Sequence, residues 1–280
     1  MIRLGKIGFA NCDFPYYGIE HNIIPIEKVT IIESHPVHLA KKISNKELDI
    51  SPISSIMYPK LSNLRILPDI SITSNDFTKS VLVCANKLGS LEDLSGKTLC
   101  IPETTATSAT LIRILLLKKG IHCKYMACKG LEVSDMLKIG DAALLIGDSA
   151  LHAIMKLNKT KLKVIADLGN EWKNMTGKKM VYALWVVREE YAKKYPENVE
   201  YILKKLLLSK NYGMEHISEI ADLIGKKKNI DSGFMREYLH TLNYDFDMES
   251  IDSLKQFFKY AKECGLLEKE VNLKFFERGL

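Results

Sequence analysis

The sequence predicts an α/β protein with two lobes and a double hinge, and three observations support this fold class. The chain has 280 residues, more than one ordinary domain needs. Short apolar runs alternate with helix-length patterns, as in proteins with mostly parallel strands. Two apolar strands, Ser80–Ala85 and Met180–Val187, flank a middle segment with its own alternation. We therefore expect lobe 1 at residues 1–84 with 186–280, an inserted lobe 2 at 85–185, and a cleft between them.

The first lobe is predicted to contain short strands that run into polar turns. One strand is followed at once by two serines, at what looks like a helix start. A further extended segment leads through a polar loop to the first crossing strand. In chain order, the expected elements are strand Arg3–Phe9, loop Asn11–Pro15, strand Val29–Ser34, helix Pro36–Leu48, strand Asp49–Ile53, extended segment Arg65–Thr73 and loop Ser74–Lys79.

The second lobe begins after a turn-rich stretch at residues 86–97. From Glu189 on, apolar residues recur at three- and four-residue spacing, so this part is expected to be helical. Its aromatic residues fit a core face. The expected elements of the second lobe are strand Thr98–Ile101, loop Pro102–Thr105, helix Ala106–Lys119, strand Ala142–Ile146, strand Leu162–Gly169 and a polar turn to Gly177.

The composition excludes several classes of protein. Apolar residues make up 46% and charged residues 26%, so the chain can bury a core and is not disordered. The net charge is +6, but the lysines are scattered, which favours a small anionic ligand over a nucleic-acid groove. No stretch approaches the roughly 18 consecutive apolar residues of a membrane helix, and no signal-peptide core forms at the start. We expect a soluble, cytoplasmic protein that binds neither nucleic acid nor membrane; its oligomeric state is left open.

The cysteines and histidines do not indicate a metal site. Six cysteines lie mostly inside apolar runs without C-x-x-C spacing, which is typical of reduced core residues. Cys123 and Cys128 form the closest pair, but no second pair or nearby histidine follows. The seven histidines are separated and lack zinc-ligand spacing. We expect neither a bound metal nor a cofactor.

Three strand-to-helix turns are rich in small polar residues. The first N–H groups of a helix have no partner within the helix, and its dipole adds positive charge, so such turns can hold a carboxylate. The alternative is that these residues only cap their own helices, and Asp148 fits a cap best. Three such turns in one two-lobed chain favour a shared ligand site. The residues proposed to bind substrate are Ser54, Ser55, Thr104, Thr105, Thr107, Ser108 and Asp148.

Asn11 follows the first strand and is the fourth polar candidate. Its side-chain amide can both donate to and accept from a ligand. The alternative is an ordinary turn asparagine in the loop that also holds Asp13 and Pro15. The residues themselves do not decide between the two.

Four segments follow one another between residues 48 and 188: LDISPISSIMY, PETTATSATLIRILL, ALLIGDSAL and DLGNEWKNMTGKKMVYALWVVR. In this order and spacing they resemble the chorismate dehydratase family of the futalosine route to menaquinone. The N-terminal KIGFANCDFP and the C-terminal EYLHTLNYDFDMESIDSLKQFFKYAKECGLL also resemble it, so the resemblance covers the whole chain. It implies a type II periplasmic-binding-protein fold, and it implies catalytic roles for Asn11 and Ser80. The first loop departs from the family pattern, because Ala10 precedes Asn11 and Pro15 comes one residue late.

The activity that this resemblance implies is a carbon–oxygen lyase reaction, the loss of water from chorismate to give 3-[(1-carboxyvinyl)oxy]benzoate. Aromatisation drives the reaction, so the protein needs only to orient a dianion and assist proton removal and hydroxide departure. The matched segments contain no His or Glu pair, which suggests that a carboxylate of the substrate takes the proton. No cofactor is then required.

Three alternatives stay open from the sequence. The first is a non-catalytic solute-binding protein of the same fold, for which an export signal would be expected. The second is a sister enzyme that acts on a futalosine-derived substrate or on another ring acid. The third is a ligand-sensing domain linked to transcription, but no separate basic helix-turn-helix is present. Whether the host makes menaquinone cannot be read from this chain.

Overall fold

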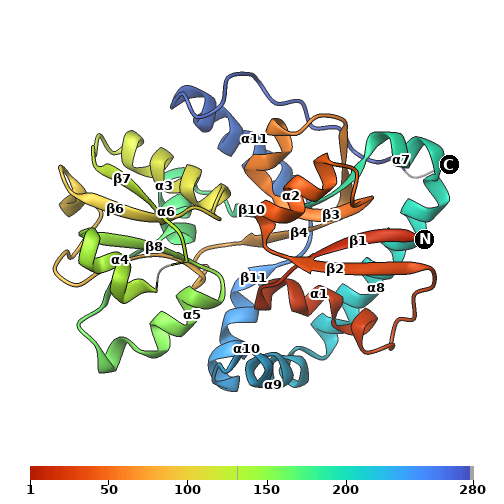
Figure 1. The fold of residues 1–280 in the computed structure, drawn as a ribbon, viewed down its shortest axis with the longest axis horizontal. Coiled ribbons are helices and arrows are strands. Elements are labelled where there is room, and N and C mark those ends of the chain that lie inside the picture. The colour runs from red at the N-terminus through yellow and green to blue at the C-terminus, as the bar shows by residue number, and fades with distance from the viewer. Residues whose placement is uncertain (131, 278–280) are drawn as a thin grey trace. The chain divides into compact units, whose positions relative to one another are not determined.

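The computed structural model describes residues 1–130 and 132–277 and divides them into two units, each with its own β-sheet (Figure 1). The α/β prediction is confirmed. The chain passes between the units inside three of its elements, β4 (Leu64–Ser74), β10 (Met180–Arg188) and α11 (Met248–Glu263). Unit 1 comprises Met1–Thr73, Val181–Asp252 and the segment from Val271, and unit 2 comprises Ser74–Met180 and Ser253–Glu270.

These units have other boundaries than the predicted lobes at 1–84 with 186–280 and at 85–185. β5 (Val81–Ala85) lies in unit 2, because it pairs along its whole length with β8 (Ala142–Ile146). Most of β10 lies in unit 1, because it pairs with β3 (Ile50–Ser54). Of the two apolar runs identified in the sequence, Met180–Val187 contains a point where the chain changes unit, whereas the preceding change lies in β4, before the run Ser80–Ala85.

The sheet of unit 1 has six strands in the order β11-β4-β10-β3-β1-β2. β1 (Ile2–Ile7) pairs in parallel with both β2 (Val29–Ser34) and β3, so these three strands end at the same edge of the sheet. β10 runs antiparallel to β3 and begins at that edge, where Ala183 pairs with Ser54. The remaining elements are α1 (Ala10–Glu20), α2 (Pro36–Ser44), η1 (Ser55–Lys60), α7 (Glu189–Lys194), α8 (Pro196–Glu215), α9 (Ile217–Lys228), α10 (Ser232–Thr241) and β11 (Leu242–Asn243).

The sheet of unit 2 has five strands in the order β7-β6-β8-β5-β9. β6 (Thr98–Pro102) is parallel to β7 (Lys124–Cys128) and to β8, whereas β5 is antiparallel to both β8 and β9 (Lys163–Asp167). The start of β5 therefore lies at the edge where β6, β8 and β9 end. The other elements of unit 2 are η2 (Glu92–Leu94), α3 (Thr107–Lys118), α4 (Val133–Ile139), α5 (Asp148–Met155), η3 (Leu157–Lys159) and α6 (Leu168–Thr176).

Two segments predicted to be irregular are helices. The expected loop at Asn11–Pro15 lies within α1, although Pro15 has no N–H to donate to the carbonyl of Asn11 one turn earlier. The expected polar turn before Gly177 is α6, whose N-cap Asp167 accepts hydrogen bonds from the N–H groups of Gly169 and Asn170. Two further elements, β7 and α4, were not predicted. β7 is an exposed edge strand without an apolar run, and α4 is a helix of seven residues with one buried residue, Met136.

Each unit buries one tryptophan. In unit 1, Trp185 is fully buried and donates its indole N–H to the hydroxyl of Tyr16 at 3.0 Å. In unit 2, the indole N–H of Trp172 lies 3.2 Å from the carbonyl oxygen of Lys179, and the ring of Phe257 lies edge-on to Trp172 at 5.9 Å. This contact holds part of α11 in unit 2. The core role predicted for the C-terminal aromatic residues is confirmed for the buried ones, which are Phe257, Phe258 and Phe276.

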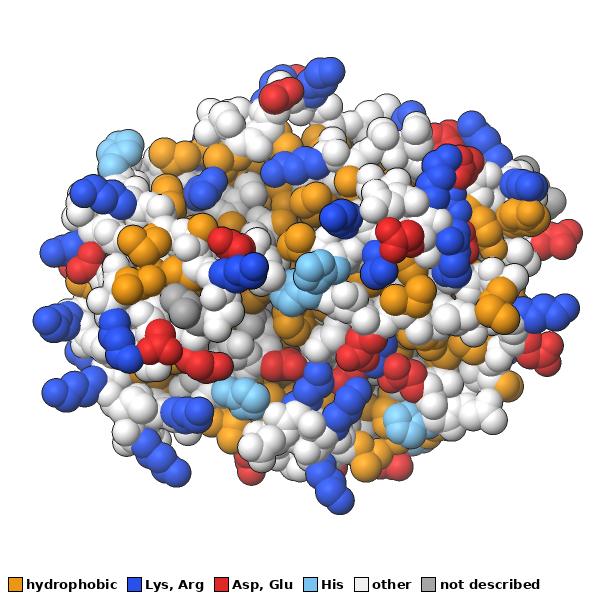
Figure 2. All heavy atoms as spheres, in the orientation of Figure 1, with side chains coloured by type: hydrophobic (Ala, Val, Ile, Leu, Met, Phe, Trp, Pro, Cys, Tyr) orange, Lys and Arg blue, Asp and Glu red, His pale blue; other side chains and the backbone are white. Residues whose placement is uncertain are grey.

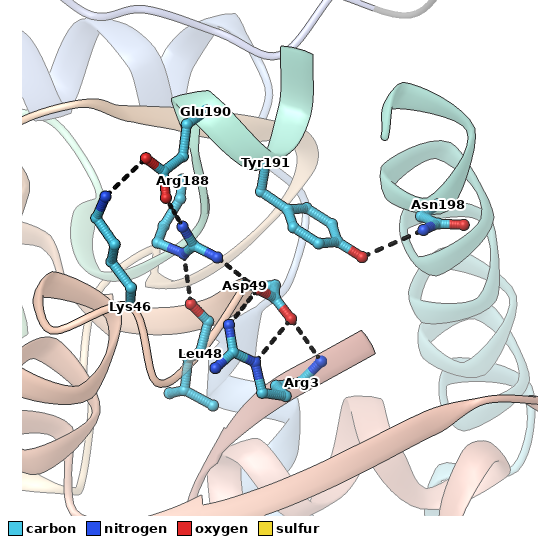
Figure 3. Close-up of polar contacts among 8 residues, drawn as sticks. All are labelled: Arg3, Lys46, Leu48, Asp49, Arg188, Glu190, Tyr191 and Asn198. Atoms are coloured by element: carbon cyan, nitrogen blue, oxygen red, sulfur yellow. Dashed lines mark hydrogen bonds and ion pairs between the residues drawn. The ribbon is translucent and has the colours of Figure 1, made fainter. Parts of the chain in front are cut away.

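The buried carboxylate of Asp49 pairs with arginines from two strands of unit 1, β1 and β10. Asp49 lies between two guanidinium groups, with Arg3 Nη2 at 2.7 Å and Arg188 Nη2 at 2.6 Å from its Oδ1 (Figure 3). The backbone N–H of Arg3 also donates to Asp49 Oδ2 at 2.9 Å. Burial alone would raise the pKa of Asp49, but the hydrogen bonds from Arg3 and Arg188 outweigh it and lower that pKa below its ordinary value.

Asp49→Asn is expected to lower the free energy of unfolding at pH 7 by up to about 3 kcal/mol, because it leaves the largely buried Arg188 with only the half-exposed Glu190 as an anionic partner. The carboxyl has a lower pKa in the folded chain than in the unfolded one. Its contribution is therefore fully present above about pH 5 and is lost as the pH falls below about 4.

Urea unfolding of wild type and variant at pH 7 and in acid measures this difference. The gap between the two proteins should narrow at the lower pH; a gap that is equal at both pH values would contradict the assignment. Asp222→Asn is a suitable control, because the Asp222–Arg236 pair is half-exposed on both sides and such pairs contribute less than about 1 kcal/mol.

The surface and the cysteines agree with the sequence in two respects. On the face drawn in Figure 2, Lys and Arg side chains are interspersed with Asp and Glu rather than gathered in one stripe. All six cysteines are free thiols, and four of them are buried: Cys12, Cys84, Cys100 and Cys128. Across residues 1–130 and 132–277, no helix is long and apolar enough to span a membrane.

Candidate active site

In unit 1, Asn11 and the pair Ser54–Ser55 follow two parallel strands that end at the same edge of the sheet. β1 ends at Ile7 and α1 begins three residues later, so Asn11 lies in the first turn of this helix. β3 ends at Ser54, and Ser55 begins η1. In open α/β sheets, ligands bind outside the carboxyl ends of the strands. This edge is therefore the candidate site of unit 1.

Asn11 has a buried side-chain oxygen that no neighbour satisfies. Among the described residues, Oδ1 of Asn11 has no hydrogen-bond partner. A buried acceptor without a partner costs about 1 to 3 kcal/mol, so such groups are rare unless they serve a ligand. The helix N-cap at Phe9 makes no side-chain hydrogen bond either. A hydrogen-bond donor brought to this position would therefore satisfy Oδ1 of Asn11.

The two serines at this edge differ. Ser55 is buried, and its hydroxyl donates to the carbonyl oxygen of Val181 at 2.8 Å, which fixes the start of β10 against η1. Ser54 is half-buried and occupies the N-cap of η1 without a side-chain cap hydrogen bond. Of the two, Ser54 has the more accessible position for a ligand.

A buried lysine stands directly behind this edge, and the sequence analysis did not identify it. Lys6 is fully buried in β1, and its ammonium lies 2.6 Å from Asp13, 2.7 Å from Glu20 and 3.0 Å from Glu33. Although burial disfavours its charge, the hydrogen bonds that its ammonium donates to Asp13 and Glu20 raise the pKa of Lys6 above its ordinary value. A charged residue inside an apolar strand was the available signal. The cluster fixes α1, and with it Asn11, to β1 and β2.

In unit 2, the remaining predicted residues share one edge of the five-stranded sheet. Ser80 precedes β5 and is buried, and its carbonyl oxygen accepts the N–H of Gly147 at 2.8 Å. Gly147 is the N-cap of α5, and Asp148 is the first residue of that helix. Thr104 and Thr105 lie between β6 and α3 and are half-buried. Thr107 and Ser108 form the first, buried turn of α3.

The N-cap positions of α3 and α5 are not occupied by the predicted polar residues. The N-cap of α3 is Ala106, which makes no side-chain cap hydrogen bond. The N-cap of α5 is Gly147, so Asp148, which fitted a cap best from the sequence, lies one residue inside the helix. Gly147 has a φ of +57°, a conformation that costs glycine little. The N-cap positions of α3 and α5 are thus held by Ala106 and Gly147 rather than by the predicted polar residues.

A second buried carboxylate that the sequence analysis did not consider lies at this edge. Asp167 ends β9, and it accepts the N–H of Thr78 at 3.0 Å and the N–H of Lys79 at 2.7 Å. Burial raises the pKa of Asp167 above its ordinary value, against backbone N–H groups that act to lower it. Asp167 thus holds Thr78 and Lys79, the two residues just before Ser80, although it lies 89 and 88 positions further along the chain.

The two sheet edges, each taken by itself, carry amide or hydroxyl groups and helix-start N–H groups, which can hydrogen-bond an anion. Among residues 1–130 and 132–277, no group of three or more His, Cys, Asp or Glu side chains is arranged to hold a metal ion. The predicted residues fall into two sets, Asn11 with the serines in unit 1 and Ser80 with the threonines and Asp148 in unit 2.

Comparisons with known proteins bear on the predicted resemblance. A family model described as menaquinone biosynthesis matches residues 2–263. The curated chorismate dehydratase of Thermus thermophilus is 24% identical over 259 residues, which cover 88% of this chain and 90% of that protein. The predicted family resemblance is confirmed.

Solved structures support the fold. A protein from Archaeoglobus fulgidus has a TM-score of 0.80 at 19% identity and covers 95% of this chain and 98% of its own. The periplasmic aliphatic sulphonate binding protein SsuA from Escherichia coli has a TM-score of 0.73 at 12% identity, covering 99% and 92%. The predicted periplasmic-binding-protein fold is thereby confirmed.

Proposed function

Since the chain belongs to the menaquinone biosynthesis family, we propose that it is a hydro-lyase that removes water from chorismate to give 3-[(1-carboxyvinyl)oxy]benzoate. The observation that carries this proposal is the similarity to a chorismate dehydratase over 88% of the chain. Each unit by itself carries polar strand-end residues of the kind that bind carboxylates.

The proposed reaction breaks two bonds on neighbouring ring carbons. The C–H bond on the ether-bearing carbon gives its proton to a base, its electron pair forms the new ring double bond, and hydroxide leaves the adjacent carbon as water. The ring becomes aromatic, which supplies the driving force. A carboxylate of the substrate serves as the base, and the protein contributes orientation and stabilisation of the developing charge.

Asn11 and Ser80 hold the reacting groups in this proposal. The buried, unpartnered Oδ1 of Asn11 supports its role, because a ligand donor such as the ring hydroxyl would satisfy it. Thr104, Thr105, Thr107 and Ser108 at the start of α3, Asp148 at the start of α5 and Ser54 and Ser55 at η1 lie where N–H groups and hydroxyls can bind carboxylates. Of these, Asp148 acts through the helix start that it opens rather than through its own negative charge.

The experiment is to incubate the purified protein with chorismate and follow the substrate and its dehydrated product by mass spectrometry. We expect a product lighter by one water, formed in proportion to the protein concentration. The same protein should be titrated with an alkanesulphonate, the ligand class in the name of the Escherichia coli structural relative. Chorismate that stays intact while the sulphonate binds would overturn the proposal in favour of a solute-binding role.

A further inference from the structure

We propose that Asp167 is a positioning residue that sets the conformation of the segment carrying Ser80, an inference that rests on the proposed function. Both oxygens of its carboxylate take part. Oδ1 accepts the N–H of Gly169 at 2.9 Å and so caps α6, whereas Oδ2 accepts the N–H of Lys79 at 2.7 Å. The N–H of Thr78 lies 3.0 Å from each oxygen. One side chain thus links a helix start to the two residues that precede Ser80.

The tethered segment adopts a conformation that needs support. Lys79 has a φ of +58°, in the left-handed region that non-glycine residues seldom occupy. Such a conformation costs on the order of 1 to 3 kcal/mol and persists only where the surroundings impose it. The N–H of Lys79 donates a short hydrogen bond to the largely buried carboxylate of Asp167, and this bond can offset that cost.

Further contacts hold the same segment against α6. The hydroxyls of Ser74 and Thr78 lie 2.8 Å apart, and the side-chain amide of Asn170 donates to Asp76 at 2.6 Å. Gly169 allows this close approach, because a Cβ there would lie 2.3 Å from the carbonyl oxygen of Asp76. Ser80 itself is fixed on its far side by the bond from Gly147. Asp167 thus accepts the N–H groups of Thr78 and Lys79, and the other contacts hold the residues on either side of them.

Asp167→Asn separates the two functions of this carboxylate. Asparagine is as good a helix N-cap as aspartate, so its single oxygen can keep the bond to Gly169. Its NH2 group then faces the N–H of Lys79 and cannot accept from it. We expect kcat for chorismate to fall roughly 10- to 100-fold and the thermal midpoint to fall by a few degrees, as the loss of one buried hydrogen bond implies. Asp93→Asn is the matched control, because Asp93 also accepts two loop N–H groups but follows β5 at the opposite edge of the sheet.

A double-mutant cycle distinguishes positioning of Ser80 from a general structural role. In the Ser80→Ala background, Asp167→Asn should change kcat by less than about twofold, because the group that it positions is already absent. An equal loss of kcat in both backgrounds would overturn the proposal. So would an Asp167→Asn enzyme with unchanged kcat.

Hydrogen exchange keeps this test independent of the proposed reaction. The amides of Thr78 and Lys79 should exchange at least about tenfold faster in Asp167→Asn than in wild type. If wild type leaves chorismate intact, the proposed function fails, yet faster exchange still supports the tether and unchanged exchange overturns it. Should Asp167→Asn not fold, Asn170→Ala removes the 2.6 Å bond to Asp76 from a half-buried position, and the same acceleration at residues 76–78 is expected.

Discussion

Lys6→Met is expected to lower the free energy of unfolding by about 3 to 5 kcal/mol, since it removes one partner from a buried cluster of charges. The Lys6 ammonium is fully buried and contacts three carboxylates, of which Asp13 has only 4% of its side chain exposed. Methionine fills a similar volume, so the loss is electrostatic rather than a cavity. In the variant, Lys227 at 3.1 Å and Lys228 at 3.6 Å still contact Asp13, but they belong to the end of α9, so the link between Asp13 and β1 is lost.

Urea unfolding at pH 7 measures this loss, and two further variants interpret it. Lys42→Met removes a lysine whose pair with Glu47 is exposed on both sides, so it should change the free energy of unfolding by less than about 1 kcal/mol. The double variant Lys6→Met with Asp13→Asn should recover part of the loss, because it removes the uncompensated carboxylate. A Lys6→Met protein as stable as wild type would show that the cluster does not stabilise the fold.

This cluster shows where sequence reasoning ends. The apolar run of β1 was sufficient to predict a central strand, because alternation and length depend only on neighbouring residues. The partners of Lys6 come from α1 and β2, and Lys227 and Lys228 approach Asp13 from the end of α9 more than 200 positions away. No local pattern encodes such pairs. The sequence thus predicted the strand, but it did not predict that Lys6 is buried there or which carboxylates pair with it.

The corrected elements have local causes. Pro15 made a loop the better prediction for residues 11–15, because proline is seldom tolerated beyond the first turn of a helix. α6 was missed since its polar sequence resembles a turn, and only the contact of Trp172 with the aromatic rings of α11 shows which face is buried. The exposed edge strand β7 carried no apolar signal. In each case tertiary packing outweighed local preference.

The candidate site was predictable to a similar extent. Strand-to-helix turns rich in Ser and Thr could be located from local patterns, and the structure places those of each unit at one sheet edge. Asp167 could not be identified in this way, because its bonds to Thr78 and Lys79 join residues 88 and 89 positions apart. In the sequence, Asp167 lies near the end of the predicted strand Leu162–Gly169, and nothing local marks it as a site residue.

Asn11→Ala is expected to lower kcat/KM for chorismate by about 10²- to 10³-fold, the usual cost of losing one preorganised polar group at a reacting centre. Stability should change little, because Oδ1 of Asn11 has no hydrogen-bond partner among the described residues and so loses none. A large kinetic effect with a small stability effect is the signature of a residue that serves a ligand.

Two comparison variants make this prediction specific. Asn11→Asp keeps the shape of the side chain but places a negative charge near a dianionic substrate, so it should raise KM as well as lower kcat. Asn45→Ala alters an exposed asparagine at the end of α2 and should leave both constants unchanged. Steady-state kinetics on chorismate measures the kinetic effect of each variant, and urea unfolding measures its effect on stability. If Asn11→Ala is destabilised and its kcat is unaltered, Asn11 belongs to the packing of α1 against β1, and the unpartnered oxygen would have to be satisfied by water.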